Sequence, residues 1–559
     1  MRLQRNFMWI RLWQGLSDLS DPHQMKDMDR LVEILAQKIR KQVHIRIIGD
    51  YDVDGVTSSH LFLTALRRVG AKVDVVIPHR IQDGYGLSLH LLQQAKEDGV
   101  DTILTCDNGI AAIDEIAWAK AQKMTVLVTD HHAVPFEEHE GRRTEKKSLA
   151  DAVVNPHQQD CRYPYKELCG AGVAWNVIRV LYENYDMDKR EAEDLLDFVA
   201  MATVCDVMSL TGENRILVKE GLKRIRHTKN IGLQALMQAC NVQPENISAY
   251  HFGYVLGPCV NATGRLDTAR HALRLFETGQ ETEAEEIARD LVDLNQERKE
   301  LTLQGVEMAK KLCEEGGYEN DPVLVLFLPD VHESIAGLIA GRIREMYNRP
   351  VFVLTRGEEG VKGSGRSTEN YSMYENMCGC AELFTKFGGH PMAAGLSLPE
   401  ENVEKFRRKI NENCPLTVEE VCPDIHIDMA MPVGYASTEL VHQFALLEPF
   451  GKDNPSPLFA DRNLSISRMW VIGKNRNVLR MSVLSEYGQP VPVIFFGDVE
   501  TLFAYFTEKF GQEEVENALH GRKNRILFSM VYTAKVDFYQ GNENLQLEMK
   551  YYRLSLIHI

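Results

Sequence analysis

The chain has 559 residues, of which 44% are hydrophobic and 26% charged, and its net charge is −17. This length is too great for one hydrophobic core and predicts three or more domains. The sequence has no run of about 18 apolar residues, no secretory signal at its start and no regular spacing among its 11 cysteines, so we expect a cytoplasmic protein with reduced thiols, no disulfide framework and no membrane-spanning helix.

Strand-like and helical segments alternate from residue 43 to about residue 160, after a helical lead-in over residues 1–42. The strand-like runs are residues 43–49, 73–78, 102–106, 125–129 and 152–155. Alternation at this spacing predicts an α/β fold with a parallel sheet. The charged, turn-rich residues 136–147 predict a surface excursion.

The rest of the chain predicts a connector, a second α/β unit and a barrel. Residues 281–316 predict a long charged helix between two lobes, although an ordinary surface helix on one lobe would give the same pattern. Short strand-like runs from residue 424 onward predict a small β-barrel, plausibly an OB-fold. The predicted domains are the lead-in 1–42, a first α/β lobe 43–275, a connector helix 276–318, a second α/β lobe 319–420 and the barrel 421–559.

Four acidic motifs in the first 206 residues follow apolar segments: Asp50-Tyr51-Asp52-Val53-Asp54-Gly55, Cys106-Asp107-Asn108-Gly109, Asp130-His131-His132 and Asp206. Because the carboxyl ends of parallel strands meet at one edge of a sheet, we expect these side chains to converge. Clustered carboxylates repel one another unless a cation lies among them. Oxygen ligands with one or two histidines suit Mn²⁺ or Mg²⁺, and two such ions about 3.5–4 Å apart commonly serve phosphodiester hydrolysis.

Each motif also has an ordinary explanation when it is taken alone. Asp52 could cap the helix that begins near Gly55, and Asp107 could cap the helix after Gly109. The run Asp130-His131-His132 is harder to explain by packing, because three polar residues in a row end an apolar strand. The four groups together predict a metal site. The acid surplus is unusual for a nucleic-acid-binding protein, but bound metal or a local basic groove is compatible with it.

These motifs resemble those of the DHH phosphoesterase superfamily. Two glycine-rich motifs of the second lobe are similar to the nucleotide-binding motifs of its DHHA1 domain: Gly363-Ser364-Gly365-Arg366-Ser367 and Phe387-Gly388-Gly389-His390-Pro391. Residues 257–265 and 447–455 resemble segments of the RecJ family of bacterial single-strand-specific 5′→3′ DNA exonucleases. The resemblance implies that residues 43–275 form a DHH catalytic domain, 319–420 a DHHA1 nucleotide-binding domain and 421–559 an OB-fold DNA-binding domain.

The resemblance also implies a role for each matched residue. Two Mn²⁺ or Mg²⁺ ions would be held with Asp107 as the bridge, one by Asp54, Asp107, His131 and Asp206 and the other by Asp52 and Asp107. His132 would face the phosphate or orient His131, and His390 would approach the phosphate from the second lobe.

A pocket for a terminal 5′-phosphate is implied at Arg80, Ser364 and Arg366, the last two in a glycine-rich turn. Arginine offers paired donors to phosphate oxygens, and a pocket that receives only a strand end makes an exonuclease. Asn261 and Arg265 would grip the next nucleotides. The barrel would add a platform for single-stranded DNA, although aromatic residues of its strands are more typical of a core: Trp470, Phe495 and Phe496.

Three departures from the family pattern stand out. Ile48 occupies a place where many members carry a histidine, which predicts a weaker or water-completed metal position. Cys259 stands where an arginine is common, which predicts a lost DNA contact. The residues Val331-His332-Glu333-Ser334 stand where Trp-His-Gln-Gly is usual.

The activity that the resemblance implies is a single-stranded-DNA-specific 5′→3′ exonuclease that releases 5′-mononucleotides in DNA repair and recombination. Single-stranded DNA would be its main partner, with a single-strand-binding protein and a RecQ-type helicase as further partners and no membrane. Two alternatives stay open. A DHH oligonucleotide or phosphoadenosine phosphatase would be shorter and lack a barrel, and a non-catalytic single-strand-binding relative of RecJ would lack metal ligands.

Overall fold

The computed structural model divides the chain into two compact units. The larger unit contains Gly15–Met208 and Gly212–Asp424, and the smaller contains Ile425–Ile559 with two short segments, Met1–Gln14 and Ser209–Thr211. The residues that the structure describes are 14–79, 86–139, 142–266, 269–318, 321–357, 360–416, 425–473, 477–539 and 542–554.

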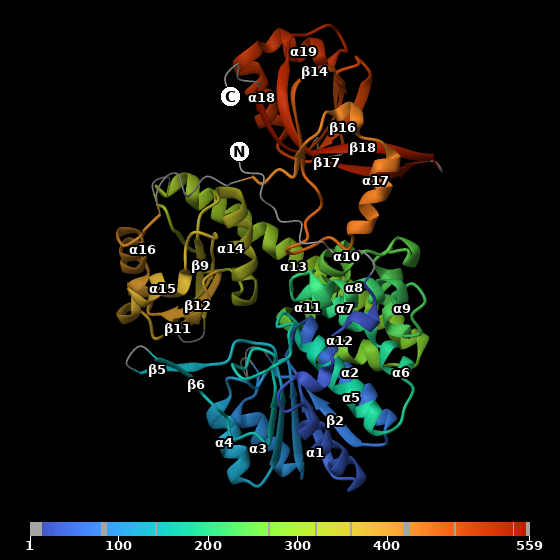
Figure 1. Ribbon diagram of the computed structural model, residues 1–559. Helices are drawn as coiled ribbons and strands as arrows, with labels where there is room; N and C mark the ends of the chain where they lie inside the picture. The colour runs from blue at the N-terminus through green and yellow to red at the C-terminus, as the bar shows by residue number, and fades with distance from the viewer. Residues whose placement is uncertain are drawn as a thin grey trace. The chain divides into compact units, whose positions relative to one another are not determined.

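Five parallel strands form the first sheet of the larger unit, in the order β2-β1-β3-β4-β7 (Figure 1). Their bounds are β1 His44–Ile48, β2 Lys72–Val76, β3 Thr102–Cys106, β4 Thr125–Thr129 and β7 Ala152–Val154. The central strands are buried on both faces, which explains their unbroken apolar runs. The predicted parallel α/β lobe is confirmed.

Helices cover both faces of this sheet. One face carries α1 (Met28–Arg40), α2 (Val53–Arg68) and α5 (Gly170–Asn184), and the other carries α3 (Leu89–Glu97) and α4 (Ile113–Ala121) (Figure 1). β1 pairs with β2 on one side and β3 on the other, so the chain switches direction between β1 and β3. In open α/β sheets, ligands bind at the carboxyl ends of strands beside such a switch point.

Residues 136–147 form a hairpin, a detail that the predicted surface excursion did not specify. Its strands are β5 (Phe136–His139) and β6 (Arg142–Glu145), and Lys146 Nζ lies 3.0 Å from Glu137 Oε1. Phe136 and Glu137 are about half exposed. Among the hairpin side chains whose burial the structure describes, none is buried, so no alternation of buried apolar residues marks these positions in the sequence.

A series of helices follows the sheet: α6 Arg190–Glu193, α7 Leu196–Cys205, α8 Gly212–Ile225, α9 Ile231–Ala239, α10 Ala249–His251, α11 Gly257–Leu266 and α12 Ala269–Glu277. The next helix, α13 (Glu281–Glu315), has 35 residues and is about 52 Å long at 1.5 Å per residue. It contacts α9 and α11 in the first lobe and α14 in the second. The prediction of two lobes joined by a long helix is confirmed.

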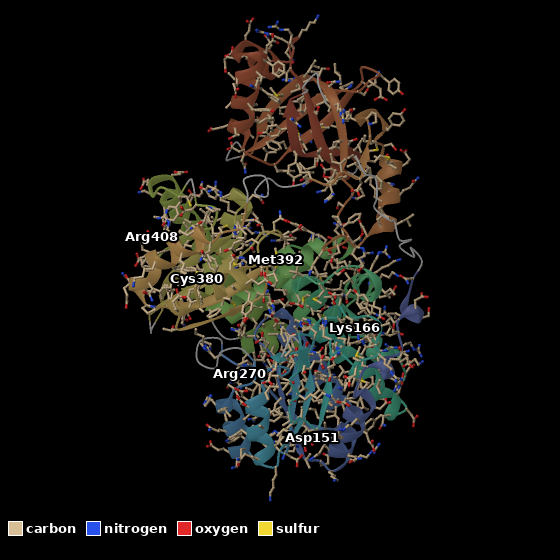
Figure 2. All side chains as sticks on the ribbon, turned by 60° about the vertical axis from the view of Figure 1, so that its left-hand side comes forward. Asp151, Lys166, Arg270, Cys380, Met392 and Arg408 are labelled. Carbon is tan, nitrogen blue, oxygen red and sulfur yellow. The ribbon has the colours of Figure 1, made fainter. Side chains whose placement is uncertain are left out.

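The second lobe is a five-stranded sheet in the order β11-β12-β10-β9-β8, in which only β8 and β9 pair in parallel. Cys380, labelled in Figure 2, is fully buried in its core. The strands are β8 Leu324–Phe327, β9 Val351–Gly357, β10 Gly360–Arg366, β11 Lys386–Gly389 and β12 Ala393–Leu398, and the helices are α14 Glu333–Tyr347, α15 Met373–Cys378 and α16 Val403–Glu412.

The placement of Ser364 and Arg366 in a glycine-rich turn is wrong, because both residues lie on the central strand β10. A Cβ atom at Gly363 would lie 2.4 Å from Leu354 Cδ2, and one at Gly365 would lie 2.4 Å from Met373 Sδ. The two glycines therefore serve close packing of the core against one face of the strand rather than a turn.

The smaller unit contains a closed barrel of five strands. They are β14 Phe459–Ile472, β15 Val478–Leu484, β16 Pro490–Phe495, β17 Leu527–Tyr539 and β18 Asn542–Leu554. The order β14-β15-β16-β18-β17 closes through pairing of β17 with β14, so the OB-fold prediction is confirmed. Helices α17 (Thr438–Phe444), α18 (Val499–Phe510) and α19 (Gln512–Leu519) accompany the barrel, as does the short strand β13 (Met429–Ala430).

Two of the three barrel aromatics singled out in the sequence lie at the surface. Phe495 is buried in the barrel core, whereas Trp470 is 37% exposed and Phe496 is 59% exposed. Among the helices that the structure describes, none combines the length and the apolar character needed to cross a bilayer.

Candidate metal centre and active site

Aspartate and histidine side chains meet at the carboxyl edge of the first sheet. They come from the loops that follow β1, β3 and β4, and Asp206 adds a carboxylate as the C-cap of α7. Three groups each offer ligand atoms within 4.8 Å of one another: Asp107, His131 and His132; Asp54, His131 and Asp206; and Asp50, Asp52 and Asp107. The structure thus brings together the five predicted metal ligands and adds Asp50.

His131 is at the centre of this cluster and is 8% exposed. Its Nε2 atom lies 3.0 Å from Asp107 Oδ1, and two more carboxylate oxygens follow at 3.6 Å (Asp206 Oδ2) and 3.7 Å (Asp54 Oδ2). Burial lowers the pKa of His131 despite these aspartates. A neutral imidazole with a lone pair directed at several carboxylates is the arrangement of a metal ligand.

The electrostatics of the cluster favour a cation. Burial, followed by the charges of neighbouring aspartates, raises the pKa of Asp107 well above its usual value. Burial and the charge of Asp54 likewise raise the pKa of Asp52. Divalent ions would remove this repulsion, and carboxylates with one or two imidazoles match the ligand preference of Mn²⁺ and Mg²⁺.

Backbone geometry fixes the first aspartates. Asp52 caps α2 by accepting a hydrogen bond from Gly55 N at 3.0 Å, so its capping role and its place in the cluster coexist. A Cβ atom at Gly55 would lie 2.5 Å from Asp50 N and O, so only glycine lets the loop fold back onto Asp50. Ile48 is fully buried in β1, and Asp50 supplies a carboxylate beside Asp52 and Asp107.

The start of α5 holds Asp54 and Asp107 in place. Gly170 N donates to Asp54 Oδ2 at 2.6 Å, and Ala171 N donates to Asp54 Oδ1 at 2.8 Å. Asp107 has a left-handed φ of 61°, and a Cβ atom at Gly170 would lie only 2.6 Å from its Cβ. Asp107 is not a helix cap, because α4 begins at Ile113 with Ala112 as its N-cap.

Asp130 organises the loop rather than joining the cluster. Its Oδ1 accepts hydrogen bonds from the backbone nitrogens of His131 (2.7 Å) and His132 (3.0 Å), and its Oδ2 accepts one from Ile110 N (2.8 Å). Asp130 Oδ1 also lies 2.8 Å from His132 Nδ1. Burial acts to lower the pKa of His132, but the bond to Asp130 and its charge outweigh burial and raise that pKa to about 9.

His390 of the second lobe reaches the same region. It lines a cavity of about 360 Å³ together with His132, Asn108 and Gly109 of the first lobe. The side chain of His132 is 39% exposed, so a charged imidazolium is open to this cavity. A phosphate group lying there would meet positive charge next to the aspartate cluster.

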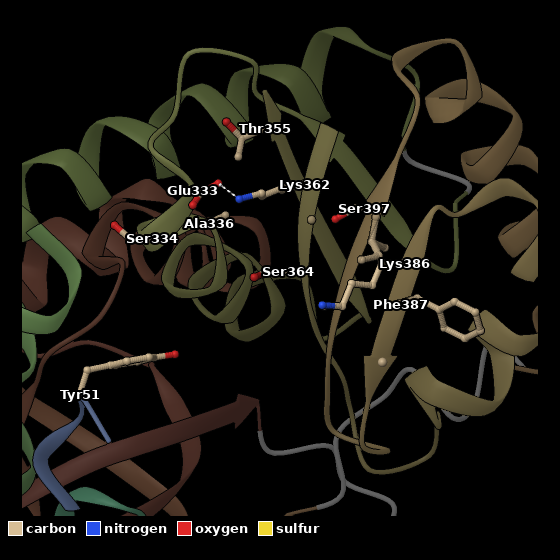
Figure 3. A pocket seen from close by; sticks show the side chains of 14 residues that line it. Tyr51, Glu333, Ser334, Ala336, Thr355, Lys362, Ser364, Lys386, Phe387 and Ser397 are labelled. Atoms are coloured by element: carbon tan, nitrogen blue, oxygen red, sulfur yellow. Dashed lines mark ion pairs between the residues drawn. The ribbon is translucent and has the colours of Figure 1, made fainter. Parts of the chain in front are cut away.

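A second cavity of about 410 Å³ lies between Tyr51 of the first lobe and the sheet of the second (Figure 3). Ser364 lines it, together with Lys386 and Lys362, and Lys362 Nζ lies 2.8 Å from Glu333 Oε2. This ion pair joins two residues to which sequence reasoning gave no role.

The predicted phosphate and DNA ligands differ in what they contact. Arg366 Nη1 donates to the backbone oxygen of Gly365 at 2.7 Å, and Asn261 Oδ1 accepts a hydrogen bond from Val53 N at 3.1 Å. Arg265 Nη1 donates to Ser334 O at 2.6 Å and so links the two lobes. Asn261 therefore braces the start of α2 beside Asp52, and Arg265 braces the contact between the two lobes. Arg80 lies outside the described residues.

Family models match three segments of the chain. The N-terminal domain of the DHH family matches residues 44–203, the DHHA1 domain matches residues 320–414 and the RecJ OB domain matches residues 427–551. Fold and aspartate cluster together define a DHH-type phosphoesterase with an added OB domain.

Curated relatives narrow this class. The single-stranded-DNA-specific exonucleases RecJ of Haemophilus influenzae and Escherichia coli are each 32% identical, cover 96% and 98% of this chain, and are each covered over 92% of their length. The chain belongs to the RecJ family. The Bacillus subtilis relative of the same name is 33% identical over 85% of this chain, which spans 59% of that protein.

Solved structures of RecJ proteins match the fold of this chain. The crystal structure of RecJ from Thermus thermophilus in complex with Mn²⁺ matches with a TM-score of 0.77 and 26% identity, over 97% of this chain and 73% of that chain. A crystal structure of exonuclease RecJ bound to manganese matches with a TM-score of 0.61 and 31% identity, over 71% of this chain and 96% of that chain.

Proposed function

We propose that the protein is a single-stranded-DNA-specific exonuclease that hydrolyses phosphodiester bonds from the 5′ end and releases 5′-mononucleotides. The observation that carries this proposal is the buried cluster of aspartates around His131, which faces a lobe bearing His390. RecJ relatives are named for this activity. We further propose a cytoplasmic role in DNA repair and recombination, with a single-strand-binding protein and a RecQ-type helicase as partners.

The metal-binding residues would be Asp52, Asp54, Asp107, His131 and Asp206. When bound, two Mn²⁺ or Mg²⁺ ions would act as Lewis acids on a phosphodiester and favour hydroxide near neutral pH. The first amides of α5 donate hydrogen bonds to both carboxylate oxygens of Asp54 and so orient this side chain. Asp130 keeps His132 protonated, so that its imidazolium can bind a phosphate oxygen.

The second lobe would bind the 5′-terminal phosphate of the DNA strand. Ser364 lines the cavity beside Tyr51, and Arg366 follows two residues later on the same strand, β10. A guanidinium and a hydroxyl on a rigid strand suit a terminal phosphate, which carries more charge than an internal one. With Arg80, these residues make the proposed 5′-phosphate site.

The barrel would bind the strand farther from its end. Trp470 on β14 lies opposite Arg480 on β15, and the Arg468 guanidinium lies 5.7 Å from the centre of the Trp470 ring. All three side chains are exposed. An indole beside two arginines provides both stacking for a base and positive charge for the backbone.

Digestion of labelled oligonucleotides tests the proposal. With Mn²⁺, a single strand labelled at its 5′ end should release labelled mononucleotide at once, whereas a 3′ label should stay in long products until late. Duplex DNA should resist. Asp107→Asn keeps the shape of the side chain and should lose activity by several orders of magnitude at an unchanged Tm. Early release of the 3′ label would refute the polarity, and Mn²⁺-dependent hydrolysis by the variant at the wild-type rate would refute the metal assignment.

A further inference from the structure

A third cavity, of about 940 Å³, opens in the first lobe. Residues from α2, α7 and α8, the loop before α9 and the end of α12 line it. Arg67 and Arg68 place it at the carboxyl end of α2, whereas Asp52 and Asp54 lie at the amino end. Arg67 lies 13 positions after Asp54 on α2, a rise of about 20 Å at 1.5 Å per residue, so the mouth of this cavity is distinct from the aspartate cluster.

The inner wall of this cavity contains a buried imidazole. His60 is 5% exposed, and its ring centre lies 4.4 Å from that of Phe198 and 5.8 Å from that of Phe276. Its Nδ1 atom has no hydrogen-bond partner within the described part of the chain. Burial lowers the pKa of His60 to about 3, so the ring is neutral near pH 7. A buried nitrogen without a partner is costly. A rotation of the ring that turned Nδ1 toward the cavity would let a bound ligand supply the missing hydrogen bond.

The same wall carries a carboxylate. Asp197 is 4% exposed and lines the cavity, where its Oδ2 accepts a hydrogen bond from Thr228 Oγ1 at 2.7 Å. With His60 and the two phenylalanines, it forms a surface that combines aromatic faces with polar atoms. A planar heterocycle that bears its own donors and acceptors matches this chemistry, because ring stacking and a few directed hydrogen bonds can form together.

The mouth of the cavity is mostly basic. Arg67, Lys223, Arg224, His227 and Lys229 line it. Glu220 pairs with both Lys223 (2.6 Å) and Arg224 (3.2 Å), and Glu277 Oε2 lies 3.9 Å from Arg67 Nη1. Asp194 is the remaining acidic residue at the mouth. Lys229 is exposed, so the mouth offers the positive charge of a lysine to an anionic group.

We propose that this cavity binds a nucleoside 5′-monophosphate, with its base against His60 and Phe198 and its phosphate at Arg67 and Lys229. The proposal is independent of the nuclease activity, because none of these residues belongs to the aspartate cluster or to the cavities beside His390 and Tyr51. The nucleotide is either a deoxynucleotide released from DNA or a ribonucleotide from the cell, and the two sources share the chemistry that the cavity recognises.

Calorimetric titration of the full-length protein with AMP and with dAMP tests the proposal. EDTA is present so that the aspartate cluster holds no metal with which to bind phosphate. Saturable binding at one site is expected, and adenosine without a phosphate should bind at least about tenfold more weakly, since charge-assisted hydrogen bonds are lost. Similar affinities for AMP and dAMP would mean that both sources are accepted, and preference for one identifies the source.

Variants locate the site. Arg67→Ala and Lys229→Ala should each weaken binding by about fivefold, as expected for partly exposed charges, and His60→Phe should weaken it further if Tm is unchanged. Lys311→Ala removes an exposed charge from α13 and should leave binding as in the wild type, as should Asp107→Asn. If His60→Phe does not fold, the affinities of Arg67→Ala and Lys229→Ala alone test whether this cavity binds the nucleotide.

Photolabelling of the wild-type protein gives a second readout. With 8-azidoadenosine monophosphate, crosslinked peptides should come from α2, α7 or α12. No saturable binding at millimolar nucleotide, equal affinity in Arg67→Ala, Lys229→Ala and wild type, or labelling confined to peptides around Ser364 would overturn the proposal.

Discussion

Replacing Gly170 with alanine should disable the metal centre without unfolding the protein. The added Cβ would lie 2.6 Å from Asp107 Cβ, about 0.8 Å short of the 3.4 Å at which ordinary contact begins. Asp107 cannot easily yield, because its backbone already has a φ of 61° and Asn108 Nδ2 holds the next residue to Ile48 O at 3.0 Å. Either Asp107 or the start of α5, which binds Asp54, must move.

The expected loss follows from that displacement. A misplacement of about 1 Å in a catalytic group can lower a rate about 100-fold, and loss of a supporting partner lowers metal affinity by about 10–100-fold. We therefore expect about a 100-fold lower rate of Mn²⁺-dependent digestion and weaker Mn²⁺ binding by calorimetry. The Tm should change little, because alanine is a better helix former than glycine.

Gly172→Ala is the matched control on the same helix. A Cβ atom there meets Leu168 at 3.4 Å, which is ordinary contact, so this variant should keep wild-type rate and Mn²⁺ affinity. Activity and Mn²⁺ affinity of Gly170→Ala within twofold of wild type would refute the idea that close packing against Gly170 positions Asp107.

Three further predictions concern other parts of the chain. Burial raises the pKa of Asp197 to about 6, above about 3.9 in an unfolded chain, so the folded state binds the proton more tightly and stability falls as pH rises from about 4 to 6. Urea denaturation of Asp197→Asn should therefore give a free energy of unfolding roughly 2–3 kcal/mol above wild type at pH 7.5 and equal to it at pH 4; parallel pH curves would contradict this. Trp470→Ala should weaken binding to long single strands by about 1–3 kcal/mol in fluorescence anisotropy while cleavage of very short strands is unchanged, and equal affinity would assign the barrel another task. Arg366→Ala and removal of the substrate's 5′-phosphate should each raise KM by about the same factor, roughly tenfold or more, and the double change should add little; additive losses would place Arg366 away from the phosphate.

Much of the fold could be predicted from local pattern. The central strands of the first sheet are buried on both faces, so their apolar runs stand out against the helices. The helix α13 was predicted from its apolar spacing, and its contacts with both lobes remove the alternative of a helix on one lobe. The glycine-rich strand β10 and the hairpin β5–β6 were missed. Strand β10 carries glycines at positions where neighbouring side chains fill the space. The hairpin side chains whose burial the structure describes are exposed or half-buried.

The candidate metal centre was predicted from residue types in order along the chain, because three of the four motifs follow a strand and Asp206 follows the apolar segment that forms α7. What supports it was not predictable in this way. The contacts of Gly170 and Ala171 with Asp54 join residues 116 and 117 positions apart, and they use backbone nitrogens, which carry no residue signature. Asp50 was visible in the motif, but only the fold of the loop over Gly55 turns it toward Asp107.

The unbroken helix α13 has a mechanical consequence. Its first half contributes Leu291 to the first lobe, and its second half contributes Val306 to the core of the second. Val306 lies 15 positions after Leu291, so the helix holds these two residues about 22 Å apart along its axis. Gly305 of α13 lies against Ile339 of α14, and a Cβ atom at Gly305 would lie 2.3 Å from Ile339 Cδ1. This close packing fixes the rotational position of the second lobe about the axis of α13. Relative movement of the two cores then requires helix α13 to bend, because no flexible loop separates Leu291 from Val306. The spacing should therefore respond to force and to helix length, and little to salt.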